Sequence, residues 1–228
     1  RQRQMCIRDR HIPLQQLTGE QDFMGLTFAV NEHVLIPRQD TEILVEEVLK
    51  ELHDGMRVLD MCTGSGCILL SLLHYSNDCE GLGVDLSAEA LEVAGRNVLK
   101  VLTPEKAEHA HFLQSDLFEK VEGKFEIIVS NPPYIASAEV EKLMPEVRDH
   151  EPRMALDGTE DGLYFYRRII EEAGKHLVSS GMLFFEIGYD QGQAVSELMR
   201  TEGYCEVQVV QDYAGLDRVV LGTYCERN

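Results

Sequence analysis

The sequence predicts an α/β fold: a doubly wound, seven-stranded, mostly parallel sheet with an antiparallel C-terminal strand, preceded by a short β-hairpin. Two observations carry this prediction. Short apolar runs rich in β-branched residues alternate with segments of helical periodicity, which is typical of β–α–β units. The last two apolar runs, at 207–210 and 219–224, follow one another directly, so we expect them to close the sheet as an antiparallel pair.

The first elements form the hairpin and a helix. Residues 23–36 read as two short strands, with Phe28 and Val30 alternating before a turn at residues 31–32. Asp40 or Thr41 is expected to cap the next helix, whose apolar face holds Ile43, Leu44, Val48 and Leu49. Arg38 precedes this helix, and two interpretations stay open for it: a solvated surface arginine, or a residue that helps to close a pocket.

A strand at 56–61 leads into a glycine-rich turn, Cys62-Thr63-Gly64-Ser65-Gly66, and then into an apolar helix through Leu73. A strand, a glycine-rich turn and a helix together bring backbone N–H groups close to a ligand. The third glycine of a dinucleotide fingerprint is absent, because Leu69 stands in its place, and no Gly-Lys-Ser/Thr follows. The turn alone is also consistent with a plain connection between strand and helix.

Two further strands bring acids to the same edge of the sheet. The strand at 81–85 ends in Asp85, a carboxylate suited to both hydroxyls of a ribose, and Ser87 should cap the helix 88–99. A strand at 109–114 then places Asp116 and Leu117 on that edge, where they suit the amino group and the face of a purine. Asp116 fits a simple turn or cap equally well.

The run Phe125-Glu-Ile-Ile-Val-Ser predicts a buried strand, and Asn131-Pro132-Pro133-Tyr134 ends it in a rigid loop. Ligands of open α/β sheets bind at the carboxyl ends of the strands. Asn131 offers an acceptor and a donor that can hold a planar –NH2 beside a C=O or a ring nitrogen, and Tyr134 offers a flat face. An ordinary strand-to-loop turn is the alternative.

The remaining segments complete the fold. Residues 136–157 form a long loop of the kind that often covers a ligand. Asp161 should cap a helix with Leu163, Tyr166, Ile169, Ile170 and Ala173 on one face. A strand at 181–187 and a helix at 191–201 precede the closing strand pair.

Composition excludes several classes of protein. The chain carries 21 basic and 40 acidic residues, a net charge of −19, which disfavours binding to nucleic acid. No apolar run is long enough for a membrane span, and we expect no secretory signal, because no basic start followed by an apolar middle is seen. The six cysteines include no Cys-x-x-Cys pair, so we expect neither a zinc site nor a disulfide framework, and a reducing cytoplasm. His109 and His111 lack a third ligand nearby, so no metal is expected.

Several motifs together resemble the HemK-like release-factor glutamine methyltransferases, within the class I S-adenosylmethionine methyltransferases of Rossmann-like fold. The similarity runs from about Leu14 to the C-terminus. Its motifs are Pro13-Leu-Gln-x-Leu-Thr-Gly-Glu20, Phe23-x-Gly-Leu26, Leu35-Ile-Pro-Arg38, Thr63-Gly-Ser-Gly66, Asn131-Pro-Pro-Tyr134, Glu151-Pro-Arg-x-Ala-Leu156 and Asp161-Gly-Leu163. Asn-Pro-Pro-Tyr also occurs in adenine-specific methyltransferases, whereas the flanking motifs are more specific.

The resemblance implies S-adenosylmethionine as the methyl donor, no metal, and a set of site residues. Its cofactor contacts would be Cys62, Thr63, Gly64, Ser65, Gly66, Asp85, Asp116, Leu117 and Asn131. Its substrate contacts would be Asn131, Pro132, Pro133 and Tyr134, with Asn131, Pro132 and Tyr134 as the catalytic group. Cys62 departs from the family's glycine, and we expect the turn to form without positive φ at that residue.

The resemblance also implies a domain organisation. Residues 1–10 read as a non-native leader, and 11–40 as a linker and hairpin at the junction with an N-terminal helical domain. Residues 41–228 form the methyltransferase domain. Because the family carries that helical domain and this chain begins just after it, we expect the sequence to be a fragment.

The implied reaction transfers a methyl group to the side-chain amide nitrogen of the glutamine in the Gly-Gly-Gln motif of peptide-chain release factors. The Asn131 side-chain oxygen and the Pro132 carbonyl would accept the two amide hydrogens. The alternatives are a ribosomal-protein glutamine, the amino group of adenine in nucleic acid, and a binding module without catalysis. We expect a cytoplasmic monomer with no direct contact to nucleic acid or membrane.

Overall fold

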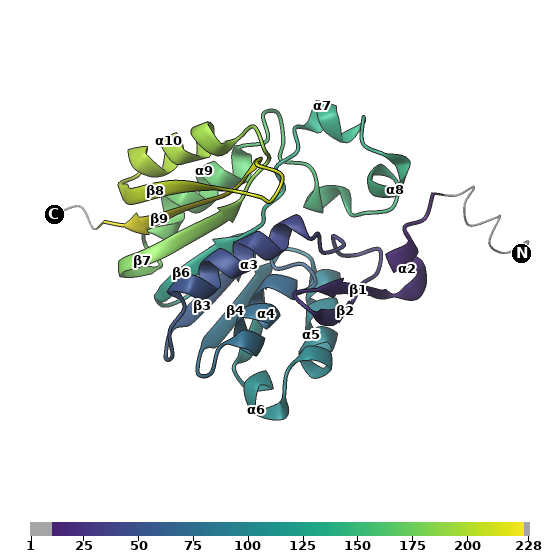
Figure 1. Ribbon diagram of the computed structural model, residues 1–228, viewed down its shortest axis with the longest axis horizontal. Coiled ribbons are helices and arrows are strands. Elements are labelled where there is room, and N and C mark those ends of the chain that lie inside the picture. Colours follow the sequence, from purple (N-terminus) through teal and green to yellow (C-terminus); the bar gives the residue numbers. More distant parts are fainter. Residues whose placement is uncertain (1–10, 226–228) are drawn as a thin grey trace, which may run out of the picture.

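The computed structural model describes residues 11–225, and a seven-stranded sheet in the order β5-β4-β3-β6-β7-β9-β8 runs through this part of the chain (Figure 1). The strands β3 to β7 pair in parallel, whereas β9 runs antiparallel to both of its neighbours. The predicted mostly parallel sheet with an antiparallel C-terminal strand is thus confirmed. The strands are β3 (Arg57–Met61), β4 (Glu80–Asp85), β5 (Ala110–Gln114), β6 (Phe125–Ser130), β7 (Leu177–Glu186), β8 (Tyr204–Gln211) and β9 (Asp217–Tyr224).

Helices cover both faces of the sheet, which is why its strands are apolar on both sides. Successive residues of β6 show this: Ile127 and Val129 pack in one core cluster, and Ile128 packs in the other. The first cluster also contains residues of α3 (Asp40–Glu51), α4 (Cys67–Tyr75) and α5 (Ala88–Val101), which α6 (Pro104–Ala107) follows. The second contains residues of α9 (Tyr164–Ala173) and α10 (Gly192–Thr201).

The hairpin is present, but its turn lies earlier than predicted. It follows α2 (Leu14–Thr18) and consists of β1 (Glu20–Phe23) and β2 (Leu26–Ala29). The turn is formed by Met24 and Gly25, with φ of 51° and 70°, and not by residues 31–32. Two positive φ values are what a tight two-residue hairpin requires. Methionine is uncommon at the first position of such a turn, so Gly25 was the one residue type there that favours it.

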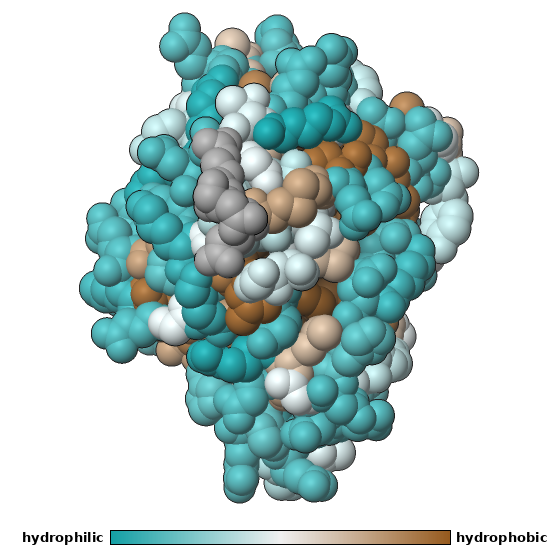
Figure 2. All heavy atoms as spheres, turned by 90° about the vertical axis from the view of Figure 1, so that its left-hand side faces the viewer, coloured by the Kyte–Doolittle hydropathy of each residue, from teal (hydrophilic) through white to brown (hydrophobic). Residues whose placement is uncertain are grey.

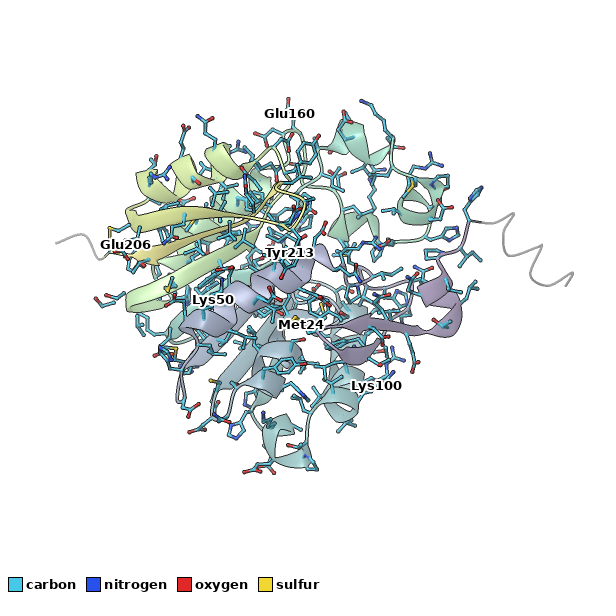
Figure 3. The ribbon with its side chains drawn as sticks, in the orientation of Figure 1. Met24, Lys50, Lys100, Glu160, Glu206 and Tyr213 are labelled. Atoms are coloured by element: carbon cyan, nitrogen blue, oxygen red, sulfur yellow. A yellow bond between two sulfur atoms is a disulfide. The ribbon has the colours of Figure 1, made fainter. Side chains whose placement is uncertain are left out.

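The hairpin is attached to two helices (Figure 3). The Met24 backbone N–H donates to Glu42 of α3 at 2.7 Å, and Lys100 of α5 pairs with Glu20 at 2.6 Å. At the other end of the sheet, Tyr213 in the β8–β9 loop lies over α3 and donates to Glu46 at 3.1 Å.

One of the three predicted helix caps is confirmed. Ser87 Oγ accepts from the Ala90 N–H at 3.1 Å. The cap position of α3 is Gln39, and Asp40 instead pairs with Arg218 at 3.4 Å. Thr41 is buried in the first turn of α3 and makes no cap either.

The predicted cap of α9 is wrong as well. Leu163 occupies the cap position, and Asp161 accepts from its N–H at 3.0 Å and pairs with Arg167. Asp161 therefore stabilises the turn that precedes α9 and does not cap the helix.

The segment 136–157 is not a structureless loop. It contains α7 (Ser137–Val140), α8 (Pro145–Arg148) and a 3-10 turn, η1 (Arg153–Ala155). It lies beside α2, where Gln16 Nε2 donates to the His150 carbonyl at 2.6 Å (Figure 1).

A disulfide joins Cys205 of β8 to Cys225, which follows β9, so the expectation of no disulfide is wrong. Cys62, Cys67 and Cys79 are free thiols. The two bonded residues lie 20 positions apart, and strand pairing brings them together in a way that their spacing does not reveal.

The face at the left of Figure 1, where the chain's C-terminal end lies, is mostly hydrophilic, with smaller hydrophobic patches between the polar residues (Figure 2). Among the described residues, no helix combines the length and the apolar character that a membrane crossing would need.

Candidate active site

A cavity opens at the carboxyl ends of β3, β4 and β6, with an empty volume, open mouth included, of about 1170 Å³. Eight of the predicted site residues line it: Cys62, Thr63, Gly64, Asp85, Asp116, Leu117, Asn131 and Pro133. The other four, Ser65, Gly66, Pro132 and Tyr134, are not among the residues that line the cavity. Parallel strands that end at one edge explain why residues so far apart in sequence meet here.

The turn after β3 is left-handed at its first residue. Cys62 has φ of 63°, so the expectation that this turn forms without positive φ at Cys62 is wrong. Gly64 and Gly66 follow with φ of 54° and 77°. A non-glycine residue in this region stores strain, and such strain gathers at functional sites. Burial, and then the neighbouring Asp85 and Asp60 carboxylates, raise the pKa of the Cys62 thiol, which keeps it neutral and poorly nucleophilic.

Gly66 and Ser65 keep the glycine-rich turn packed against α4 and α5. A Cβ at Gly66 would lie 3.1 Å from Leu70 and 3.2 Å from Ala94, so glycine permits the close approach of α4 and α5. The Ser65 carbonyl accepts from Asn97 of α5 at 2.9 Å, and the same Asn97 side chain bonds both the N–H and the carbonyl of Ala29 in β2. The hairpin and the glycine-rich turn are thus tied through one buried amide.

Asp60 is a functional candidate that the sequence analysis missed. Its Oδ2 accepts from Thr63 Oγ1 at 2.6 Å and from the Leu69 N–H at 3.3 Å, while Oδ1 has no hydrogen-bond partner in residues 11–225. Burial raises its pKa to about 7. An acid inside an otherwise apolar strand was the available signal, since buried carboxylates are rare without a partner.

Asp85 is fixed at the cavity wall by two backbone donors. Its Oδ2 accepts from the Gly64 N–H and its Oδ1 from the Ser87 N–H, both at 2.9 Å. Burial raises its pKa, and these two hydrogen bonds oppose that effect. A carboxylate has about four acceptor positions, so this one can still accept from a bound diol.

Asp116 and Leu117 line the cavity after β5. Asp116 Oδ1 accepts from Arg168 of α9 at 2.9 Å, a partner that the sequence analysis did not foresee. Leu117 is buried and has φ of 46°, a second strained non-glycine residue at the cavity.

Two buried polar residues of neighbouring elements hydrogen-bond to the loop after β6. Asn131 Nδ2 donates to Thr41 Oγ1 of α3 at 3.4 Å, and Tyr134 Oη donates to Glu186 Oε1 of β7 at 3.3 Å. Burial raises the pKa of Glu186 to about 7, while hydrogen bonding from Thr41, the charge of Arg218 and the Tyr134 hydroxyl lower it. Tyr134 therefore points into the fold, and its ring is not part of the cavity lining.

Arg38 belongs to the cavity wall. It pairs with the buried carboxylate of Glu151, which also accepts from the Ile36 N–H at 3.2 Å. This pair fastens the segment 136–157 beside the cavity, and Pro152, Met154 and Ala155 of that segment form part of its lining. Between the two interpretations of Arg38, the structure favours the one that closes a pocket.

Within residues 11–225, no group of three or more histidine, cysteine or acidic residues is placed to hold a metal ion. The prediction that no metal takes part stays a prediction.

Comparisons with known proteins agree with one another. Residues 38–147 match the family model "Methyltransferase small domain". The chain is 45% identical to the release factor glutamine methyltransferase of Clostridium acetobutylicum, over 94% of this chain and 76% of that protein. It is 46% identical to the protein of the same name from Moorella thermoacetica, over 92% and 74%.

A solved structure adds to this similarity. The release-factor-specific protein-(glutamine-N5) methyltransferase of Alicyclobacillus acidocaldarius is 30% identical, with a TM-score of 0.50, over 87% of this chain and all of that one.

Proposed function

The chain belongs to the family of release factor glutamine methyltransferases, and from that membership we propose that it methylates the side-chain amide nitrogen of the glutamine in the Gly-Gly-Gln motif of peptide-chain release factors. It acts as an S-adenosylmethionine-dependent protein-glutamine N-methyltransferase. The observation that carries the proposal is the orientation of Asn131, whose nitrogen donates to Thr41 at the cavity wall.

The cavity fits the proposed methyl donor. S-adenosylmethionine supplies a methyl group on a positively charged sulfur. Asp85 would hold the ribose hydroxyls, and Leu117 and Leu86 offer apolar contact to the adenine. The acids Asp60 and Asp85 raise the pKa values of neighbouring groups, so this end of the sheet favours a cationic ligand.

Asn131 and Pro132 would hold the substrate amide. An amide nitrogen is a weak nucleophile because its lone pair is delocalised into the carbonyl. With its nitrogen on Thr41, the Asn131 side chain directs its oxygen away from that residue, free to accept an N–H of the glutamine. The Pro132 carbonyl would accept the second N–H, and together they favour a pyramidal, more nucleophilic nitrogen.

Positioning supplies most of the rate enhancement in this proposal. Fixing two reactants in line contributes on the order of 7–11 kcal/mol. No strong general base is needed, because the proton can leave after transfer. A glutamate side chain has no N–H to donate, so it would leave both acceptors unpaired and be rejected.

A cytoplasmic location, a monomeric state and independence from metal belong to the same proposal, as does the absence of direct contact with nucleic acid. The net charge of −19 supports the last of these.

The test is mass spectrometry of a bacterial release factor incubated with this chain and S-adenosylmethionine. The expected product carries one added methyl on the glutamine of its Gly-Gly-Gln tripeptide. Asn131→Ala should abolish the product and leave cofactor affinity, measured by calorimetry, within about twofold. Cofactor binding without any glutamine methylation by the unaltered chain would refute the proposal, and a methyl group on adenine or on a ribosomal protein would redirect it.

A further inference from the structure

The Asn131–Tyr134 loop lies against a later segment of the chain. Ile135, which follows the loop, donates its N–H to the Leu156 carbonyl at 3.0 Å, and its own carbonyl accepts from the Gly158 N–H at 2.8 Å. A Cβ at Gly158 would lie 2.8 Å from the Pro133 carbonyl oxygen. The two backbones therefore touch here, and a side chain at residue 158 would displace the loop.

Gln191 holds the last residue of this loop. It occupies the cap position before α10, and its side chain makes no cap hydrogen bond. Its Nε2 donates to the Tyr134 carbonyl at 3.0 Å and to the Gly162 carbonyl at 3.3 Å, and its Oε1 accepts from the Gly188 N–H at 2.9 Å. One side-chain amide thus joins three separate stretches of backbone.

Gly162 explains why these groups lie so close together. It has φ of 72°, and a Cβ there would overlap the Tyr134 carbonyl oxygen and lie 2.8 Å from Gln191 Nε2. Glycine is the residue that tolerates both conditions. Part of the motif Asp161-Gly-Leu163 is thereby explained, because its glycine allows the backbone of residue 162 to lie against the loop.

The two prolines connect this anchor to the groups that would hold the substrate. A proline fixes its own φ at about −65°, and the residue before a proline is restricted as well. Few soft torsions therefore separate the Tyr134 carbonyl from the Pro132 carbonyl, so a shift of one is carried to the other. At its other end the loop is held by the bond from Asn131 to Thr41, at 3.4 Å.

We propose that Gln191 is a positioning residue, which fixes the Asn131–Tyr134 loop through the Tyr134 carbonyl. The loop then holds its two acceptors, the Asn131 oxygen and the Pro132 carbonyl, toward the substrate amide. This inference rests on the proposed function, because it concerns the two acceptors of that same site. Gln191 and Tyr134 are not among the residues that line the cavity. We therefore expect a change at Gln191 to affect turnover and not the affinity for S-adenosylmethionine.

Two substitutions of Gln191 test this role. Gln191→Glu keeps the shape of the side chain but replaces the donor with an oxygen that faces two carbonyls. Gln191→Met keeps the length of the side chain and removes its hydrogen bonds. A misplacement of about 1 Å can lower a rate about a hundredfold. We expect Gln191→Glu to lower kcat for release-factor methylation about a hundredfold and Gln191→Met about tenfold, with the Kd for S-adenosylmethionine within about twofold.

Gln193→Glu and Gln193→Met are the matched controls. Gln193 lies in α10, and its exposed side chain bonds to Glu197 of the same helix at 3.1 Å. Both controls should leave kcat within about twofold. Activity is measured at a temperature where circular dichroism shows every variant to be folded, so a lower kcat does not reflect a loss of folded protein. An unchanged kcat in Gln191→Glu would overturn the inference.

Amide hydrogen exchange, followed by NMR, gives a readout that does not need turnover. The N–H groups of Ile135 and Gly158 should exchange about tenfold faster in both Gln191 variants, because their hydrogen bonds adjoin the loop. Val129, inside β6, should keep its exchange rate.

This readout also separates the inference from the proposed function. Unchanged exchange at Ile135 and Gly158 would overturn the inference. Faster exchange throughout β6 would overturn it too, because it would show a general loss of stability. Faster exchange confined to Ile135 and Gly158, in a chain that methylates no release factor, would support the inference and refute only the function.

Discussion

Asp60 provides the sharpest test of the electrostatics of the site. Asp60→Asn keeps the shape of the side chain and removes its charge, and the new amide oxygen can still accept from Thr63 and from the Leu69 N–H. Burial raises the pKa of Asp60 from its ordinary 3.8 to about 7. A tenfold change in proton affinity is worth about 1.4 kcal/mol, so the ionised side chain costs the folded state about 4 kcal/mol at high pH.

The sign follows from the direction of the shift. The folded protein binds the Asp60 proton more tightly than the unfolded chain does, so this contribution to stability is full below pH 3.8 and is lost as the pH rises to about 7. Asp60→Asn has no such loss. The difference in unfolding free energy between variant and unaltered protein should therefore grow by about 3 kcal/mol, in favour of the variant, from pH 5 to pH 8.

Urea unfolding followed by circular dichroism at pH 5, 6, 7 and 8 measures this difference. Glu186 has a similarly raised pKa, but it is present in both proteins and cancels in the comparison. Parallel stability profiles would refute the reasoning. Calorimetry measures the affinity of both proteins for S-adenosylmethionine. A cationic ligand favours an ionised Asp60, so Asp60→Asn should bind S-adenosylmethionine about tenfold more weakly although it is more stable.

Three further predictions concern the turn after β3 and the residues that pack against it. Gly66→Ala should lower the unfolding free energy by about 2–4 kcal/mol, because residue 66 has φ of 77° and the added Cβ would crowd Leu70 and Ala94. Gly95→Ala is the control. Residue 95 lies on the open face of α5, so this substitution should raise the unfolding free energy by about 1 kcal/mol. Asn97→Ala removes three hydrogen bonds and should cost about 2–4 kcal/mol in urea unfolding, together with cofactor affinity, and a loss of stability alone would contradict the coupling of hairpin and turn. Cys62→Gly should raise the melting temperature or leave it unchanged, because glycine relieves the left-handed backbone, whereas a marked fall would show that the buried thiol contributes more than the strain.

The sequence predicted the sheet well because each strand carries its own signal. The apolar run ending in Asn131, for example, has the length and residue types of a buried strand, and its neighbours repeat that pattern. The hairpin turn was predicted at the wrong residues because asparagine favours turns more than methionine does. The observed turn at Met24 is held by a contact to α3 that is distant in sequence. Asp40 and Asp161 were predicted to cap helices. Each instead forms an ion pair with an arginine, Asp40 with Arg218 and Asp161 with Arg167.

The parts of the site that the sequence could not reveal depend on long-range contacts. Asn131 and Thr41 are 90 residues apart, and nothing local in either segment predicts that they bond. The same holds for Arg168 and Asp116, and for the disulfide across β8 and β9. The positive φ of Cys62 likewise depends on how the turn packs in three dimensions. Residue type alone predicted a negative φ there.

The position of β9 has a consequence for the order of assembly. This strand follows β8 in the chain but lies between β7 and β8 in the sheet. During synthesis, α10 and β8 leave the ribosome before the only described strand that can join them to β7. Until Asp217–Tyr224 emerges, β7 presents an open edge on which another chain could pair. A ribosome stalled before residue 217 should therefore carry a nascent chain that chaperones still recognise, and release of those last eight strand residues should end that recognition.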